Sequence, residues 1–270
     1  MSQNSDKSIP DVQSYADHRH VAIDRVGIRG IRHPVAVVDK TGIKQHTVAT
    51  FSMTVFLPED RKGTHMSRFA QLLNEHDHDA HSVANFVELF REMNRRLDST
   101  EGTIEMTFPY FINKTAPVSG KPGMMDYEVT LRADIRRGHE PDTHVRVAVP
   151  VTTLCPCSKE ISQYGAHNQR SQVTIDARVC NNTTLFWEDL IRIAEQEASC
   201  ELYSQLKRTD EKLVTERAYE NPKFVEDLIR DIARRLDDVA GLCSYTLEVE
   251  NFESIHNHSA YAVLTRSRDD

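Results

Sequence analysis

The stretch that decides the fold spans residues 152–171 and reads TTLCPCSKEISQYGAHNQRS. Two of the five cysteines, Cys155 and Cys157, lie near its start, and His167 stands shortly before Arg170, where a strand pattern begins. Cysteine thiolates and a histidine around a polar, glycine-containing turn are typical of a metal site or a reactive thiol. The alternative is a surface turn whose cysteines pack inward, because such motifs also occur without a function.

One strand pattern precedes this stretch and another follows it, so the stretch forms the long connection of a hairpin. Apolar and polar residues alternate in both runs, which is typical of half-buried strands. The apolar positions are Val145, Val147, Val149 and Val151 before the stretch and Val173, Ile175, Ala177 and Val179 after it. An extended segment would place Cys155 and Cys157 on the same side of the chain. Both could then bind one metal, or one could bind while the other faces a substrate.

Strands and helices follow the same order in both halves of the chain. In the first half the patterns predict strands within residues 21–38, 49–57, 104–108 and 127–135, and helices within 67–73 and 83–97. In the second half they predict strands within 145–151, 173–179, 245–249 and 260–264, a helix over about 185–206 and another that begins at Asn221. The repeated ββααββ order predicts an α+β fold in which helices cover one face of antiparallel sheets.

This order divides the chain into three parts. Residues 1–18 are polar and without periodicity, so we expect a flexible tail. Residues 19–140 hold the first module, and residues 141–270 hold the second, which carries most of the candidate metal and catalytic residues. Regular edge strands leave backbone groups unpaired, and we therefore expect the sheets to close into barrels through oligomerisation.

Composition excludes several classes of protein. The formal net charge of −8 argues against nonspecific nucleic-acid binding, which depends on Lys and Arg neutralising phosphates. We find no apolar run near the roughly 18 residues of a membrane span and no secretory signal, so we expect a cytoplasmic protein without a membrane partner. In a reducing cytosol the cysteines should be thiols or ligands, and we expect Cys180, Cys200 and Cys243 to be small core residues.

An acid-rich segment, residues 207–227, connects the last two predicted helices. Its candidate carboxylates are Glu211, Glu216, Glu220 and Glu226. A charged helix surface is the simpler interpretation for most of them. Glu226 differs because its neighbours are apolar, namely Phe224, Val225, Leu228 and Ile229. We expect this carboxylate to be partly buried, where it would need a partner.

Histidines gather in two further segments. Residues 253–258 read ESIHNH and form a hairpin tip whose His256 and His258 could move protons near neutral pH, although histidines at turns are often only solvated. Residues 74–81 carry three histidines among acids, for which a solvated loop is favoured over a metal site.

Three of these segments closely resemble the prokaryotic type IB family of GTP cyclohydrolases. They are the Cys-Pro-Cys stretch, residues 210–227 (DEKLVTERAYENPKFVED) and residues 254–258 (SIHNH). Residues 63–68 (GTHMSR) also resemble a segment of the wider superfamily, and the resemblance extends from about residue 20 to residue 266. It implies a tunnelling fold with two ββααββ modules per chain, assembled into barrels and a homotetramer. It also implies conversion of GTP and water to 7,8-dihydroneopterin triphosphate and formate, in folate biosynthesis.

The resemblance further implies roles for individual residues. Cys155, His167 and Glu211 would hold a divalent metal, which could be zinc, manganese or iron. Cys157 and His256 would face the substrate. Glu226 would anchor the guanine edge.

The triphosphate needs cationic partners, for which the candidates are His65, Arg68 and either Lys159 or Arg170. In the resulting hypothesis, water activated at the metal attacks C8 of guanine, and His256 moves protons as the imidazole ring opens.

Two alternatives belong to other functional classes. A related tunnelling-fold enzyme could use Cys155 or Cys157 as a covalent nucleophile to reduce the nitrile of a deazaguanine. A nonenzymatic binding protein would instead show a closed site with four metal ligands.

Overall fold

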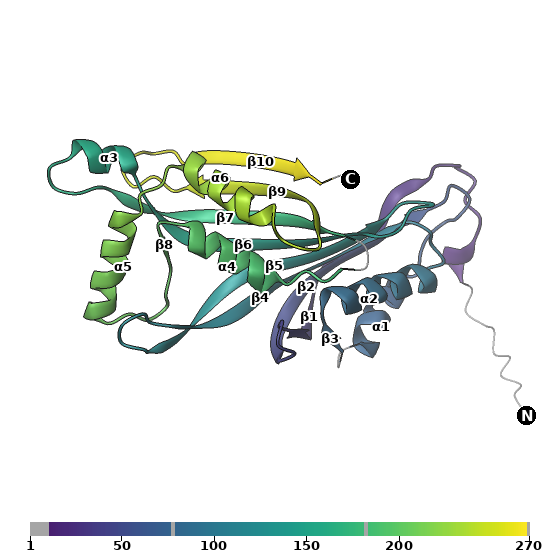
Figure 1. The fold of residues 1–270 in the computed structure, drawn as a ribbon. Coiled ribbons are helices and arrows are strands. Elements are labelled where there is room, and N and C mark those ends of the chain that lie inside the picture. The colour runs from purple at the N-terminus through teal and green to yellow at the C-terminus, as the bar shows by residue number, and fades with distance from the viewer. Residues whose placement is uncertain (1–10, 77–78, 181–182, 269–270) are drawn as a thin grey trace, which may run out of the picture.

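The computed structural model describes residues 11–76, 79–180 and 183–268. Its centre is a 10-stranded sheet in the order β10-β9-β7-β6-β5-β4-β2-β1-β3, with β8 paired to β6 off this path (Figure 1). The strands are β1 Ile23–Val38, β2 Lys44–Leu57, β3 Ala80–His81, β4 Gly102–Thr115, β5 Pro122–Ile135, β6 Asp142–Leu154, β7 Asn168–Val179, β8 Cys200–Glu201, β9 Leu242–Asn251 and β10 Ala260–Ser267. The helices are α1 Met66–Glu75, α2 Val83–Arg96, α3 Pro156–Ile161, α4 Trp187–Glu197, α5 Arg208–Glu220 and α6 Val225–Leu236, with the 3-10 helix η1 at Val12–Ser14.

Helices α1, α2, α4 and α6 pack on one face of this sheet. α1 and α2 cover the part built from β1 to β5, and α4 and α6 cover the part built from β6, β7 and β9 (Figure 1). The alternating valines of β6 are fully buried there, as are Leu228, Ile232 and Leu236 of α6. Burial of these apolar faces provides the main driving force for folding. The predicted α+β class, with antiparallel strands and helices on one face, is confirmed.

The opposite face of the sheet is polar. Between β5 and β6 it carries Glu128, Arg132, His144 and Arg146, which line a shallow cavity. His144 Nδ1 lies 2.8 Å from Asp176 Oδ1 on β7, so polar side chains pair across neighbouring strands. Alternation along each strand therefore separates an apolar core side from a solvated side.

The two halves of the chain form one continuous sheet. β5 pairs with β6 in antiparallel fashion, with Asp134 opposite Asp142. The boundary that we placed between residues 140 and 141 lies in the turn between these strands.

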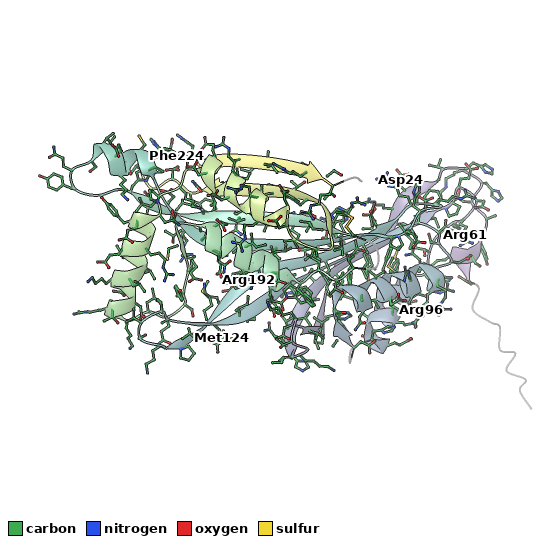
Figure 2. The ribbon with its side chains drawn as sticks, in the orientation of Figure 1. Asp24, Arg61, Arg96, Met124, Arg192 and Phe224 are labelled. Atoms are coloured by element: carbon green, nitrogen blue, oxygen red, sulfur yellow. A yellow bond between two sulfur atoms is a disulfide. The ribbon has the colours of Figure 1, made fainter. Side chains whose placement is uncertain are left out.

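The strand register defines two ends of the sheet that lie far apart. Gly102 stands opposite Val55 of β2 and Ile135 of β5, so the end of β2 lies at the same end of the sheet as the start of β6. β6 has 13 residues and, at about 3.4 Å per residue, carries the chain about 40 Å to Leu154. The Cys-Pro-Cys stretch begins there, whereas the segment after β2 stays at the other end. Figure 2 shows the labelled Arg61 and Phe224 at these two ends.

The predicted helix over residues 185–206 is wrong in extent. α4 ends at Glu197. The chain then becomes extended and forms β8, because Cys200 pairs with Thr152 of β6. The acid-rich segment, interpreted above as a connector, contains the separate helix α5. Within α5 only Asp210 and Ala218 are buried, so no apolar stripe marks the helix in the sequence.

The cysteine expectations are partly wrong. Cys180 and Cys243 form a disulfide and are only half-buried, so they are not free core thiols. The pairing of β7 with β9 brings the two residues together although they are 63 positions apart. Cys200 is buried, as predicted, and burial raises the pKa of its thiol.

Two loop expectations also change. Residues 11–18 of the predicted tail have defined contacts. They include η1, a hydrogen bond from Gln13 Nε2 to Thr64 O at 2.9 Å, and a backbone bridge between Ala16 and Arg61. Residues 1–10 lie outside the described residues. In the histidine-rich tract His81 is not solvated but lies buried in β3 beside β1, where burial lowers its pKa. Residues 77 and 78 of that tract are outside the description as well.

None of the helices in the described ranges is long and apolar enough to cross a membrane.

Candidate functional site

Cys155 and His167 lie side by side at the end of the β6–β7 hairpin. The ladder of these strands ends with Leu154 opposite Asn168, and the Cys155 N–H donates to the His167 carbonyl at 3.1 Å. The two residues therefore form the next cross-strand pair. Side chains of directly opposed residues share a face of the sheet, with Cβ atoms about 4.5–5.5 Å apart. The hairpin geometry thus brings together the two ligand types that the sequence separates by twelve positions.

Cys155 and Cys157 do not share one extended segment. Cys155 is the N-cap residue of α3, and its Sγ accepts a hydrogen bond from the Ser158 N–H at 3.4 Å. Pro156 occupies the first turn of α3, a position that its fixed φ favours. Cys155 is half-buried whereas Cys157, already on the helix, is exposed. The expectation of an alternating extended segment here is wrong, because a helix starts between the two cysteines.

The His167 side chain is held on one ring nitrogen. Its Nδ1 lies 3.0 Å from Gln169 Oε1 and 3.9 Å from Glu253 Oε2, and only 15% of the side chain is exposed. Within the described part of the chain, Nε2 has no hydrogen-bond partner, so this nitrogen is free to accept a ligand. Metal-bound histidines commonly show this division of roles between the two nitrogens.

Glu253 is a residue of this site that the sequence reasoning did not single out. The Phe252 N–H donates to the Arg170 carbonyl at 3.0 Å, which extends the contact between β7 and the chain after β9. The Glu253 side chain lies beside His167, and only 14% of it is exposed. The only sign of this role in the sequence is that an acidic residue stands at the start of the hairpin tip that carries His256 and His258.

Glu211 lies on α5 and is exposed. The far end of that helix touches α3, where Lys159 Nζ donates to the Tyr219 carbonyl and lies 4.4 Å from the Tyr219 ring centroid. Glu211 precedes Tyr219 by eight residues, which is about 12 Å along a helix. Across residues 11–76, 79–180 and 183–268, no three His, Cys, Asp or Glu side chains form a metal-binding group. One chain therefore brings Cys155 and His167 together but does not bring Glu211 to them.

The start of α5 is fixed by the residue before Glu211. Asp210 is fully buried and accepts hydrogen bonds from the backbone N–H groups of Val118, Ser119 and Lys207, each at 2.8 Å. Burial raises the pKa of this carboxyl, but these hydrogen bonds and that of the Ser119 hydroxyl outweigh it and hold the pKa below its usual range. The position of Glu211 is thus set by the turn between β4 and β5.

Glu226 and His256 are both exposed. Glu226 stands in the first turn of α6, and the expectation that it is partly buried is wrong. Successive helical residues turn by about 100°, so the burial of Val225 and Leu228 directs Glu226 to solvent. His256 stacks on His258 with ring centroids 5.0 Å apart, at the tip that follows β9.

The candidates for triphosphate binding are spread over the molecule. Arg170 is exposed on the face of β7 opposite to the buried Gln169 and Ser171. Lys159 is engaged with Tyr219, as described above. His65 and Arg68 lie at the far end of the sheet.

Both far-end residues already have partners. His65 Nε2 lies 3.3 Å from Asp11 Oδ2. Arg68 Nη1 donates to the Arg96 carbonyl at 2.9 Å, and Arg96 is labelled near the end of the molecule opposite to Phe224 (Figure 2). A single chain therefore cannot bring these two side chains to Cys155.

Structural comparison assigns the fold to the tunnelling-fold class. A hyper-thermostable mutant of AgUricase superposes with a TM-score of 0.53 at 10% identity, covering 91% of this chain and 92% of that one. The urate oxidase of Bacillus sp. TB-90 gives a TM-score of 0.51 at 8% identity, with 92% and 100% coverage. At this identity the likeness defines the fold alone.

Sequence comparison then defines the family. The model described as "Type I GTP cyclohydrolase folE2" matches residues 9–262. Proteins named GTP cyclohydrolase FolE2 from Nitrosomonas eutropha and Methylobacillus flagellatus are 57% and 58% identical over 268 residues, with 99% of each chain covered. The chain belongs to the type I GTP cyclohydrolase FolE2 family, and the resemblance inferred from the three motifs is confirmed.

Proposed function

We propose that this protein is a GTP cyclohydrolase that converts GTP and water to 7,8-dihydroneopterin triphosphate and formate, in folate biosynthesis. Family membership over the full chain supports the activity. The observation that carries the location of the chemistry is the cross-strand pair of Cys155 and His167, with Nε2 of the histidine free. We assign the activity to the cytoplasm, where GTP is made and used.

The donor set suits a divalent metal. A cysteine sulfur and an imidazole nitrogen favour zinc or iron, and addition of the Glu211 carboxylate would also admit manganese. The chemistry that such a metal supplies when bound is the activation of water for attack on C8 of guanine.

The remaining roles belong to side chains of this chain that surround the pair. Cys157, exposed on α3, faces the substrate, and His256 takes up and returns protons as the imidazole ring opens and formate leaves. The Glu226 carboxylate accepts hydrogen bonds from the N–H groups of the guanine edge, a contact that rejects bases without those donors. His65, Arg68 and Arg170 bind the triphosphate.

These roles require more than one chain. Arg68 and Cys155 lie at opposite ends of one sheet, and the 13 residues of β6 separate those ends by about 40 Å. The outer strand β10, and the part of β1 that the two-residue strand β3 does not pair with, also leave edges that another copy can extend (Figure 1). We therefore infer a homotetramer in which the active sites lie between subunits.

The direct test incubates the protein, reconstituted with zinc, manganese or iron, with GTP and follows the fluorescent oxidised pterin. We expect product with at least one metal and none with the Cys155→Ala variant. Absence of product across the whole metal series contradicts the proposal. A requirement for NADPH with a thioimide adduct would instead indicate nitrile reduction, and metal binding without turnover would indicate a binding protein.

A further inference from the structure

A hydrogen-bonded cluster of buried polar side chains lies beneath the Cys155–His167 pair. Its members are Thr153 at 0% exposure, Ser171 at 1% and Gln169 at 7%. All three side chains point to the helix-covered side of β6 and β7, in a region where neighbouring positions are valines. Burial of hydroxyl and amide groups costs free energy unless they are hydrogen-bonded, so such a cluster in an apolar core needs a reason.

The hydrogen bonds of this cluster lead to His167. Thr153 Oγ1 lies 2.8 Å from Ser171 Oγ, and Gln169 Nε2 donates to Thr153 Oγ1 at 2.8 Å. Because the amide nitrogen of Gln169 is used in this way, its Oε1 is the atom that faces His167 Nδ1, at 3.0 Å. An amide oxygen only accepts hydrogen bonds. With the amide in this orientation, the proton of the imidazole stands on Nδ1.

The Glu253 carboxylate also favours a proton on His167 Nδ1. The Glu253 carboxylate oxygen lies 3.9 Å from the same Nδ1, too far for a hydrogen bond but close enough to favour a proton there. The lone pair of the ring is then on Nε2.

We propose that Gln169 is a positioning residue, which, anchored by Thr153 and Ser171, fixes the tautomer and ring orientation of His167 so that Nε2 binds the metal. The inference rests on the proposed function only in its assumption that His167 binds a metal. Partners of this kind typically change metal affinity by about 10- to 100-fold. Gln169 itself touches neither substrate nor metal.

The test measures Co²⁺ binding by the absorbance of its cysteine charge-transfer band, with the full-length protein. We expect Gln169→Leu to weaken Co²⁺ binding by about 10- to 100-fold. Gln169→Glu, whose carboxylate still accepts from Nδ1, should stay close to the wild type. Gln172→Leu is the matched control, because Gln172 lies on the same strand but on the other face. Unchanged affinity in Gln169→Leu overturns the proposal.

A second readout needs no metal, and its main result comes from the wild-type protein. In the metal-free protein labelled with ¹⁵N-histidine, the His167 signals, identified by their loss in His167→Asn, should report a proton on Nδ1. Thr153→Val, which removes the anchor of the Gln169 amide, should shift them toward a mixture of tautomers. A proton on Nε2 in the wild type contradicts the assignment. Since neither measurement uses GTP, failure of the cyclohydrolase proposal leaves both results interpretable.

Discussion

Cys155 and Cys157 are two residues apart but have different surroundings. The first is half-buried, caps α3 and pairs with His167, whereas the second is exposed on the helix. This difference agrees with the separate roles proposed above, in which Cys155 binds the metal and Cys157 faces the substrate.

Substitution of each cysteine separates these roles. We predict that Cys155→Ala loses both metal and turnover, with affinity reduced at least about 100-fold because a ligand itself is removed. Cys157→Ala should retain a full complement of metal and lose turnover. Metal content by mass spectrometry and the pterin assay measure both. Retention of metal in Cys155→Ala would show that another residue is the ligand.

Glu226 presents an exposed carboxylate rather than the partly buried one expected from its neighbours. In the proposed role it accepts hydrogen bonds from guanine, and a hydrogen bond to a charged group contributes about 1.5–3 kcal/mol. Glu226→Ala should therefore raise the KM for GTP about 10- to 100-fold and leave metal content unchanged. It should also reduce the preference for GTP over inosine triphosphate, which lacks the exocyclic amine.

Glu220→Ala, at the exposed end of α5, is the matched control for this variant. Loss of metal in Glu226→Ala would mean that Glu226, and not Glu211, is the carboxylate ligand.

At the scale of elements, α5 is held by polar contacts rather than by an apolar face. Asp210 anchors its start to the turn after β4, and Arg217 pairs with Glu201 of β8 at 3.4 Å. The Glu201 carboxylate also lies 3.0 Å from Lys114 Nζ. Contacts with the β4–β5 turn and with β8 therefore set where this helix stands relative to the sheet.

The anchoring of α5 predicts a dependence of stability on pH. The folded-state pKa of Asp210 is depressed below the value of about 3.9 expected in the unfolded chain. Its contribution is therefore fully present above that unfolded value and is lost as pH falls toward the folded pKa. In Asp210→Asn, the free energy of unfolding should be lower than in the wild type at pH 6, with a smaller difference at pH 3.

Urea unfolding, followed by circular dichroism, provides the measurement. Glu216→Gln, an exposed acid on the same helix, serves as the control and should leave the profile unchanged. If the free energy of unfolding differed by the same amount between wild type and Asp210→Asn at all pH values, ionisation of Asp210 would not be the cause of the pH dependence.

At the scale of the molecule, the candidate residues are divided between two ends of one sheet. Cys155, His167 and the His256 tip lie where β6 and β9 end, and His65 and Arg68 lie near the end of β2. An active site that uses both groups has to be completed by a second copy of the chain.

Mixed oligomers test this arrangement. Cys155→Ala and Arg68→Ala should each be inactive alone, and co-expression of the two should restore part of the activity, because some sites then receive one intact residue from each chain. Co-expression of Cys155→Ala with His167→Asn should restore none, since both defects lie in the same half-site. Light scattering after gel filtration should give the mass of a tetramer. Full activity of a monomer would contradict the shared site.

Local patterns in the sequence predicted a large part of this fold. Alternation over residues 145–151 and 173–179 predicted β6 and β7, and the hairpin between them brought Cys155 and His167 together. The Cys-Pro-Cys stretch, the acid-rich segment and the histidine tip were sufficient to define the family, which comparison confirmed. These features depend on residues close in the chain, where periodicity and motif spacing carry the information.

Other features were decided only by the tertiary structure. The pairing of Cys180 with Cys243, the approach of Glu253 to His167 and the break after α4 each depend on strands that meet from distant parts of the chain. The exposure of Glu226 follows from how α6 turns its apolar stripe to the sheet. By itself the sequence determined most of the elements, the family and the Cys155–His167 hairpin. The tertiary structure decided which side chains accompany that pair and which stay at the far end, because those contacts join residues that no local pattern relates.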